Sequence, residues 1–166
     1  FSTQKDYPNL LHAFATVINS YPQLHLNIAG DGELREEIIS LIEQLNLKEH
    51  VSLLGRRNDI PELMSAADFF ILPSAYEGFG LVVAEAMACE TFVIATDCGG
   101  VKEVMGGYGL LVPPKNSKML ANKIIKAIEM PKEVRLINNK RALKHVQENF
   151  DLQKIILKGE EMYENK

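Results

Sequence analysis

Short, uniformly apolar segments alternate along this chain with longer segments whose apolar residues have helical spacing. FFIL (69–72) and FVIA (92–95) are apolar at every position, as in strands that are buried on both faces. Residues 6–20 and 33–46 instead place their apolar side chains on one side of a helix. Strands that alternate with helices form parallel sheets covered on both faces. The pattern predicts an α/β fold with a doubly wound, mainly parallel, Rossmann-like sheet.

The same criteria give expected bounds for each element. The expected strands are 24–30, 50–55, 68–74, 91–97 and 108–114. The expected helices are 6–20, 33–46, 59–67, about 80–89, a short one after Gly99-Gly100, 117–130, 132–149 and 151–164. Ser117 and Asp151 are the expected N-caps, and Pro131 separates two of the later helices.

The amino-acid composition is typical of a single globular domain. The 166 residues are 46% hydrophobic and 24% charged, with a net charge of −4 that favours neither a nucleic-acid partner nor an anionic membrane surface. Cys89 and Cys98 form neither a disulfide framework nor a metal cluster, so we expect reduced, buried thiols in a cytosolic protein. The chain begins at Phe1 rather than methionine, and we expect it to be a fragment of a longer protein.

The segment SAYEGFGLVVAEAMACE (74–90) combines a glycine-rich turn with two carboxylates. In parallel sheets, ligands bind where such a turn leads from a strand into a helix. Gly78 and Gly80 allow an anion near the backbone, and a helix N-terminus offers unpaired N–H groups, so a phosphate is predicted. Glu77 and Glu85 would repel phosphate but accept hydrogen bonds from sugar hydroxyls. A sugar nucleotide offers both the phosphate for the turn and the hydroxyls for the two glutamates. The alternative is that Glu77 and Glu85 are solvated surface residues.

The chain resembles the nucleotide-binding, C-terminal half of retaining GT-B glycosyltransferases of group 1, or family 4. The similar segments follow the family's order: QKDYPNLLHAFATV, LHLNIAGDGELREEI, VSLLGRRNDIPELMSAADFFILPS, YEGFGLVVAEAMA, ATDCGGVKEVM and GLLVPP. The most specific element is the E-x7-E spacing of Glu77 and Glu85. The resemblance implies that residues 1–166 are the donor-binding domain, and that an N-terminal acceptor domain is absent.

The resemblance also implies roles for individual residues. Glu77 would contact the donor sugar, Glu85 the ribose, and Lys5 the diphosphate, with Glu77 and Lys5 acting in catalysis. The backbone amides facing the diphosphate would be those of Gly78, Phe79, Gly80 and Leu81. Arg56 would lie at the base pocket, and Gly99 and Gly100 near the sugar.

The implied activity is retaining transfer of a hexosyl or N-acetylhexosaminyl group, as in polysaccharide biosynthesis. The donor would be a UDP- or GDP-sugar, with no further cofactor and, since no Asp-x-Asp element is present, no metal. The acceptor, a glycan or lipid-linked glycan, would bind through the absent domain, so this fragment alone would be inactive. The resemblance also implies that the full enzyme is cytoplasmic and can associate peripherally with the inner face of the membrane. The alternative is a non-catalytic nucleotide-binding or scaffolding module.

Two features depart from the family pattern. The family arginine precedes the lysine by five residues, a position just before Phe1, and the central strand that carries it is missing from this sequence. We therefore expect either a longer native chain or a gap in the sheet. The family's Gly-x-Pro is replaced by ETF (90–92), which puts Glu90 at a helix end where glycine avoids left-handed strain.

Overall fold

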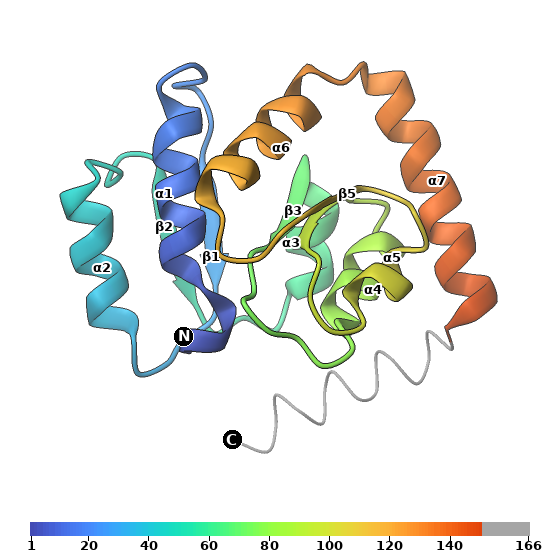
Figure 1. Cartoon of the computed structure of the whole chain (residues 1–166), viewed down its shortest axis with the longest axis horizontal. Helices are drawn as coiled ribbons and strands as arrows, with labels where there is room; N and C mark the ends of the chain where they lie inside the picture. Colours follow the sequence, from blue (N-terminus) through green and yellow to red (C-terminus); the bar gives the residue numbers. More distant parts are fainter. Residues whose placement is uncertain (151–166) are drawn as a thin grey trace.

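A computed structural model of the chain describes residues 1–150 and has the predicted α/β architecture (Figure 1). Its strands are β1 (Leu26–Ala29), β2 (Val51–Gly55), β3 (Phe69–Leu72), β4 (Phe92–Thr96) and β5 (Leu110–Val112). All the strand pairs within this range are parallel. The expected helix 151–164 and its cap Asp151 lie outside the described residues.

The helices follow the predicted order, and most of them are slightly shorter than predicted. They are a 3-10 turn η1 (Thr3–Lys5), α1 (Tyr7–Ile18), α2 (Arg35–Gln44), α3 (Ile60–Ala66), α4 (Leu81–Ala88), α5 (Val101–Met105), α6 (Ser117–Glu129) and α7 (Lys132–Asn149). The predicted N-cap Ser117 is wrong: the side chain of Asn116 accepts a hydrogen bond from the Met119 amide at 2.9 Å. Asn116 has non-helical backbone angles (φ −136°, ψ 83°), and Ser117 is already helical.

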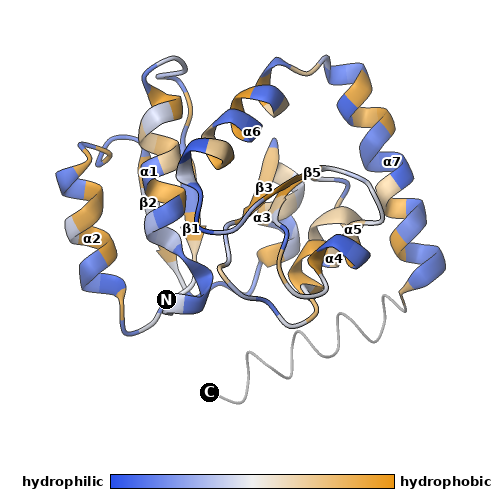
Figure 2. Cartoon of the chain, viewed as in Figure 1, coloured by the Kyte–Doolittle hydropathy of each residue, from blue (hydrophilic) through white to orange (hydrophobic). Residues whose placement is uncertain are grey.

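Strand β4 shows why the fold has helices on both faces. Every residue of β4 is buried, and its side chains alternate between two cores. Val93 and Ala95 join the cluster built with α4, α5 and α7, whereas Phe92 and Ile94 join the cluster built with α1 and α6. Figure 2 shows the corresponding apolar strands between helices whose outer faces are polar. The uniformly apolar sequence of this strand therefore reflects two covered faces.

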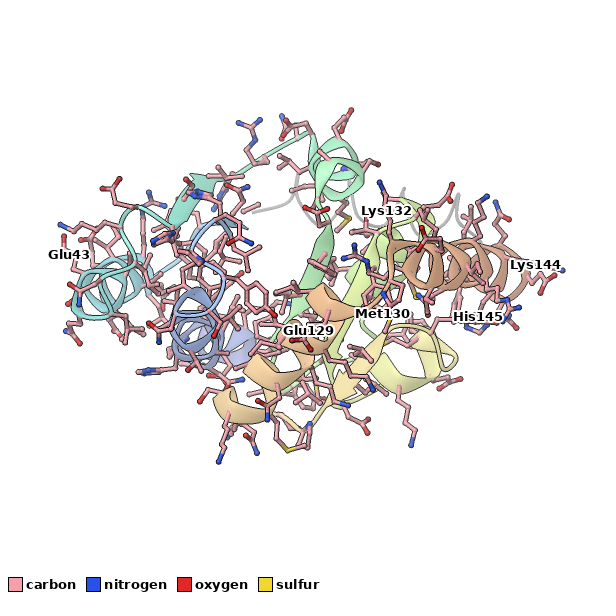
Figure 3. All side chains as sticks on the ribbon, turned by 90° about the horizontal axis from the view of Figure 1, so that it is seen from above. Glu43, Glu129, Met130, Lys132, Lys144 and His145 are labelled. Carbon is pink, nitrogen blue, oxygen red and sulfur yellow. The ribbon has the colours of Figure 1, made fainter. Side chains whose placement is uncertain are left out.

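The strands form two separate sheets, which is the main difference from a single doubly wound sheet. β1 pairs with β2, and β3, β4 and β5 form the second sheet. β1 and β3 are the nearest strands of the two sheets in Figures 1 and 3, yet no hydrogen-bonded pairing joins them. Contacts between α1 and α6 connect the two halves instead.

Two local expectations have different outcomes. Glu90 adopts the left-handed conformation (φ 54°) that was predicted for this helix end, and the Asn139 side-chain amide donates to its carbonyl oxygen at 2.7 Å. Cys89 and Cys98 are unpaired as expected but only half-buried.

Within residues 1–150, no helix is long and apolar enough to cross a membrane.

Candidate functional site

The predicted site residues gather where β3 and β4 end. The turn after β3 runs from Ser74 to Gly80, and the loop after β4 packs directly against it: the Gly100 amide donates to the Gly78 carbonyl oxygen at 2.9 Å. Gly99 has φ +54°, and a Cβ built on it would lie 1.7 Å from the Glu77 carbonyl oxygen. The two glycines therefore support the turn through their backbones, because only residues without a side chain allow so close an approach.

Lys5 and Glu77 form an ion pair at this turn. The Lys5 ammonium donates to Glu77 Oε2 at 2.9 Å, and the two side chains are 35% and 14% exposed. Lys5 is placed by η1, which is tied to the turn because the Ala75 amide donates to the Gln4 carbonyl oxygen at 2.9 Å. The sequence predicted both residues at the site but predicted no contact between them, since 72 positions separate them.

Ser74 is a site residue that the sequence reasoning missed. It is fully buried, and its hydroxyl donates to Glu77 Oε2 at 3.1 Å. Ser74 and Glu77 have the S-x-x-E spacing of a capping box, but in that motif each side chain bonds a backbone amide at a helix start. Because α4 begins only at Leu81, this spacing did not signal the bond between the two side chains.

The turn leaves a row of backbone amides without an acceptor. Within residues 1–150, no hydrogen bond is donated by the amides of Gly78, Phe79, Gly80 or Leu81. A Cβ on Gly78 would meet nothing within 4 Å, so the space beside it is open. Gly80 instead has φ +77°, and a Cβ there would lie 2.9 Å from Val101 Cγ2. The unbonded amides at the start of α4 are suited to an anion.

Of the remaining predicted residues, Glu85 and Phe79 lie on α4 and on the turn, whereas Arg56 lies after β2 in the other sheet. Glu85 lies on α4, and burial raises the pKa of its carboxyl. Phe79 is exposed on the turn, and its ring packs edge-on against Phe150 with centroids 5.8 Å apart. Arg56 follows β2 and is exposed. Among residues 1–150, no cluster of three or more His, Cys, Asp or Glu side chains is placed to hold a metal.

The fold is that of the C-terminal domain of a GT-B glycosyltransferase. The chain belongs to the family "Glycosyl transferases group 1", whose model matches residues 1–144.

Relatives with known names or structures agree with this assignment. The N-acetyl-alpha-D-glucosaminyl L-malate synthase of Bacillus anthracis is 32% identical over 98% of this chain and 43% of its own length. The Anabaena Alr3699/HepE structure in complex with UDP and glucose has a TM-score of 0.85 and 31% identity, over 100% of this chain and 46% of that one. The C-terminal domain of the group 1 family protein LpcC from Francisella tularensis has a TM-score of 0.79 and 25% identity, over 91% of this chain and 82% of that one. The chain thus spans less than half of the full-length relatives it matches.

Proposed function

We propose that this chain binds the nucleotide-diphosphate sugar of a retaining, metal-independent family 4 glycosyltransferase. The observation that carries the proposal is the turn between β3 and α4, which combines unbonded amides with the Lys5–Glu77 ion pair. Glu77 would position the donor sugar, Glu85 the ribose, and the amides of Gly78–Leu81 the diphosphate. Arg56 would line the base pocket.

The chemistry follows from where charge develops. Breaking the bond between the anomeric carbon and the phosphate leaves negative charge on the diphosphate and positive charge on the sugar ring. The Lys5 ammonium and the amides at the start of α4 would stabilise the diphosphate, each such donor being worth about 3 kcal/mol in comparable sites. Glu77 would lie beside the sugar as a carboxylate. Because Lys5 already pairs with Glu77, the diphosphate would share this ammonium with the carboxylate.

The donor is proposed to be a UDP- or GDP-sugar, and the transferred group a hexose or N-acetylhexosamine. Support for a uridine nucleotide comes from the similar Anabaena protein, which was solved with UDP and with UDP-glucose. A 34% identical Campylobacter jejuni relative is an N-acetylgalactosamine-N,N'-diacetylbacillosaminyl-diphospho-undecaprenol 4-alpha-N-acetylgalactosaminyltransferase. Its name supports a glycan or lipid-linked acceptor. We further propose that transfer takes place at the cytoplasmic face of a membrane.

We also propose that a central strand and an acceptor domain belong to the full protein. The supporting observation is the division of the sheet between β1 and β3. At the start of α1, the buried atoms Asp6 Oδ2 and Asn9 Nδ2 have no hydrogen-bond partner in the described part of the chain. Buried polar atoms are normally paired, so an added strand would give them an opportunity to bond. Transfer would then require the longer protein.

Calorimetric titration with UDP, GDP and ADP, each with and without EDTA, tests the proposal. We expect one nucleotide to be preferred, its affinity to survive EDTA, and Glu85→Ala and Lys5→Ala to weaken it. Lys48→Ala is the matched control, because it removes a similar ion pair with Glu43 on an exposed surface away from the turn. If no nucleotide binds, the titration is repeated on a chain extended by the central strand. No binding by that folded, extended chain would contradict the proposal and favour a scaffolding module.

A further inference from the structure

The buried hydroxyl of Ser74 has no role in the function described so far. Ser74 lies two residues beyond β3, is 0% exposed, and directs its hydroxyl to Glu77 Oε2. A solvent-exposed serine would exchange this bond for water at little cost. A fully buried one holds its partner in place, because no water is available to substitute.

The backbone of Ser74 is itself held by the neighbouring strand. Thr96, the last residue of β4, donates its hydroxyl to the Ser74 carbonyl oxygen at 2.6 Å, and the Cys98 thiol donates to the same oxygen at 3.4 Å. Thr96 is also fully buried. Ser74 is therefore held at the ends of β3 and β4, two hydrogen-bonded strands of one sheet.

The two hydrogen bonds to Glu77 converge on one oxygen. Oε2 accepts from the Ser74 hydroxyl at 3.1 Å and from the Lys5 ammonium at 2.9 Å. The other oxygen, Oε1, accepts none from residues 1–150. The ammonium of Lys5 is carried by a flexible four-carbon side chain, whereas the side chain of Ser74 is short and buried. The serine is thus the group that sets the orientation of the carboxylate.

We propose that Ser74 is a positioning residue that fixes Glu77 Oε2, so that Oε1 meets the hydroxyls of the donor sugar. This inference rests on the proposed function. Rigid support of a ligand-contacting side chain preserves the geometry that binding needs. Ser74 then affects recognition of the sugar, while the nucleotide is held independently by the turn amides and Glu85.

The test compares Ser74→Ala with wild type in titrations with UDP, UDP-glucose and UDP-N-acetylglucosamine. We expect Ser74→Ala to leave the UDP affinity within about twofold and to lower the affinity for the preferred UDP-sugar by about tenfold, the effect of one hydrogen bond to a charged group. Ser74→Thr, which retains the hydroxyl, should recover part of the loss. A general loss of stability would weaken UDP and UDP-sugar alike.

The control variant is Thr91→Val, which removes another buried hydroxyl bond, from Thr91 to the Met64 carbonyl oxygen at 2.6 Å, away from the turn. It should change neither affinity. An unchanged ratio of UDP-sugar to UDP affinity in Ser74→Ala would overturn the positioning role, even where both ligands bind. The positioning role would also be overturned if the wild-type protein bound the UDP-sugar no more tightly than UDP. If wild type bound none of UDP, GDP and ADP, even in a folded chain extended by the central strand, the proposed function would be overturned instead.

Discussion

The packing of Gly99 against the glycine-rich turn makes Gly99→Ala an informative substitution. A Cβ at this position would lie 1.7 Å from the Glu77 carbonyl oxygen and 2.8 Å from the Gly78 carbonyl oxygen. Ordinary carbon–oxygen contacts are about 3.3 Å or longer, so the two loops would have to separate by about 1.5 Å. That separation removes the hydrogen bond from Gly100 to Gly78.

The cost has two parts. Alanine in the left-handed conformation of Gly99 (φ +54°) costs about 1 kcal/mol. The loss of the Gly100 hydrogen bond and of the packing beside it adds about 1–2 kcal/mol. We therefore expect the free energy of unfolding to fall by about 2–3 kcal/mol. Because the turn amides would move with the loop, nucleotide affinity should fall at least about tenfold.

Gly107→Ala is the matched control, because Gly107 also has positive φ (+88°) but a Cβ there would meet no atom within 4 Å. Urea denaturation should give a loss of only about 1 kcal/mol for this variant, and calorimetry should give an unchanged affinity for UDP. Equal losses of stability and equal UDP affinities in the two variants would refute the argument that Gly99 is needed for close approach to Glu77.

Three further predictions concern other parts of the chain. Glu90→Gly should raise the free energy of unfolding by about 0.5 kcal/mol in urea denaturation, since relief of left-handed strain at φ 54° exceeds the entropy cost of glycine; a loss of stability would contradict this. Asn116→Ala should lower the free energy of unfolding by about 1 kcal/mol through loss of the α6 cap, whereas Ser117→Ala should be nearly neutral; the reverse order would restore Ser117 as the cap. Burial raises the pKa of the Glu85 carboxyl, so its protonated form stabilises the fold below the ordinary carboxyl pKa, and that contribution is lost as pH rises through the raised pKa. Glu85→Gln should therefore be more stable than wild type at pH 7 and equal to it near pH 3, and a difference independent of pH would exclude this cause.

Much of the fold follows directly from the sequence. The uniformly apolar segments FFIL and FVIA predicted β3 and β4. β4 is buried at every position, whereas in β3 only Leu72 is buried. The helix α7 has the predicted bounds 132–149. The sequence could not predict whether Asn116 or Ser117 caps α6, because both residue types are good N-caps. Only the backbone angles show that Asn116 is the cap.

The candidate site was predictable in its residue types but less so in its contacts. The turn, its glycines and both glutamates follow from one short segment. The bond between Lys5 and Glu77 spans 72 positions and depends on how η1 packs against the turn, which no local pattern specifies. The structural role of Gly99 and Gly100 likewise depends on the meeting of two loops that follow different strands.

The location of the bound diphosphate tests the central claim most directly. Uniformly ¹⁵N-labelled chain would be titrated with UDP, or with the nucleotide preferred in calorimetry, and the amide resonances followed by NMR. We predict that the largest shift changes occur at Gly78, Phe79, Gly80 and Leu81, whose amides are unbonded within residues 1–150, and that they persist in EDTA. Saturable binding with the largest changes elsewhere, and none at these amides, would contradict a donor site at the turn between β3 and α4.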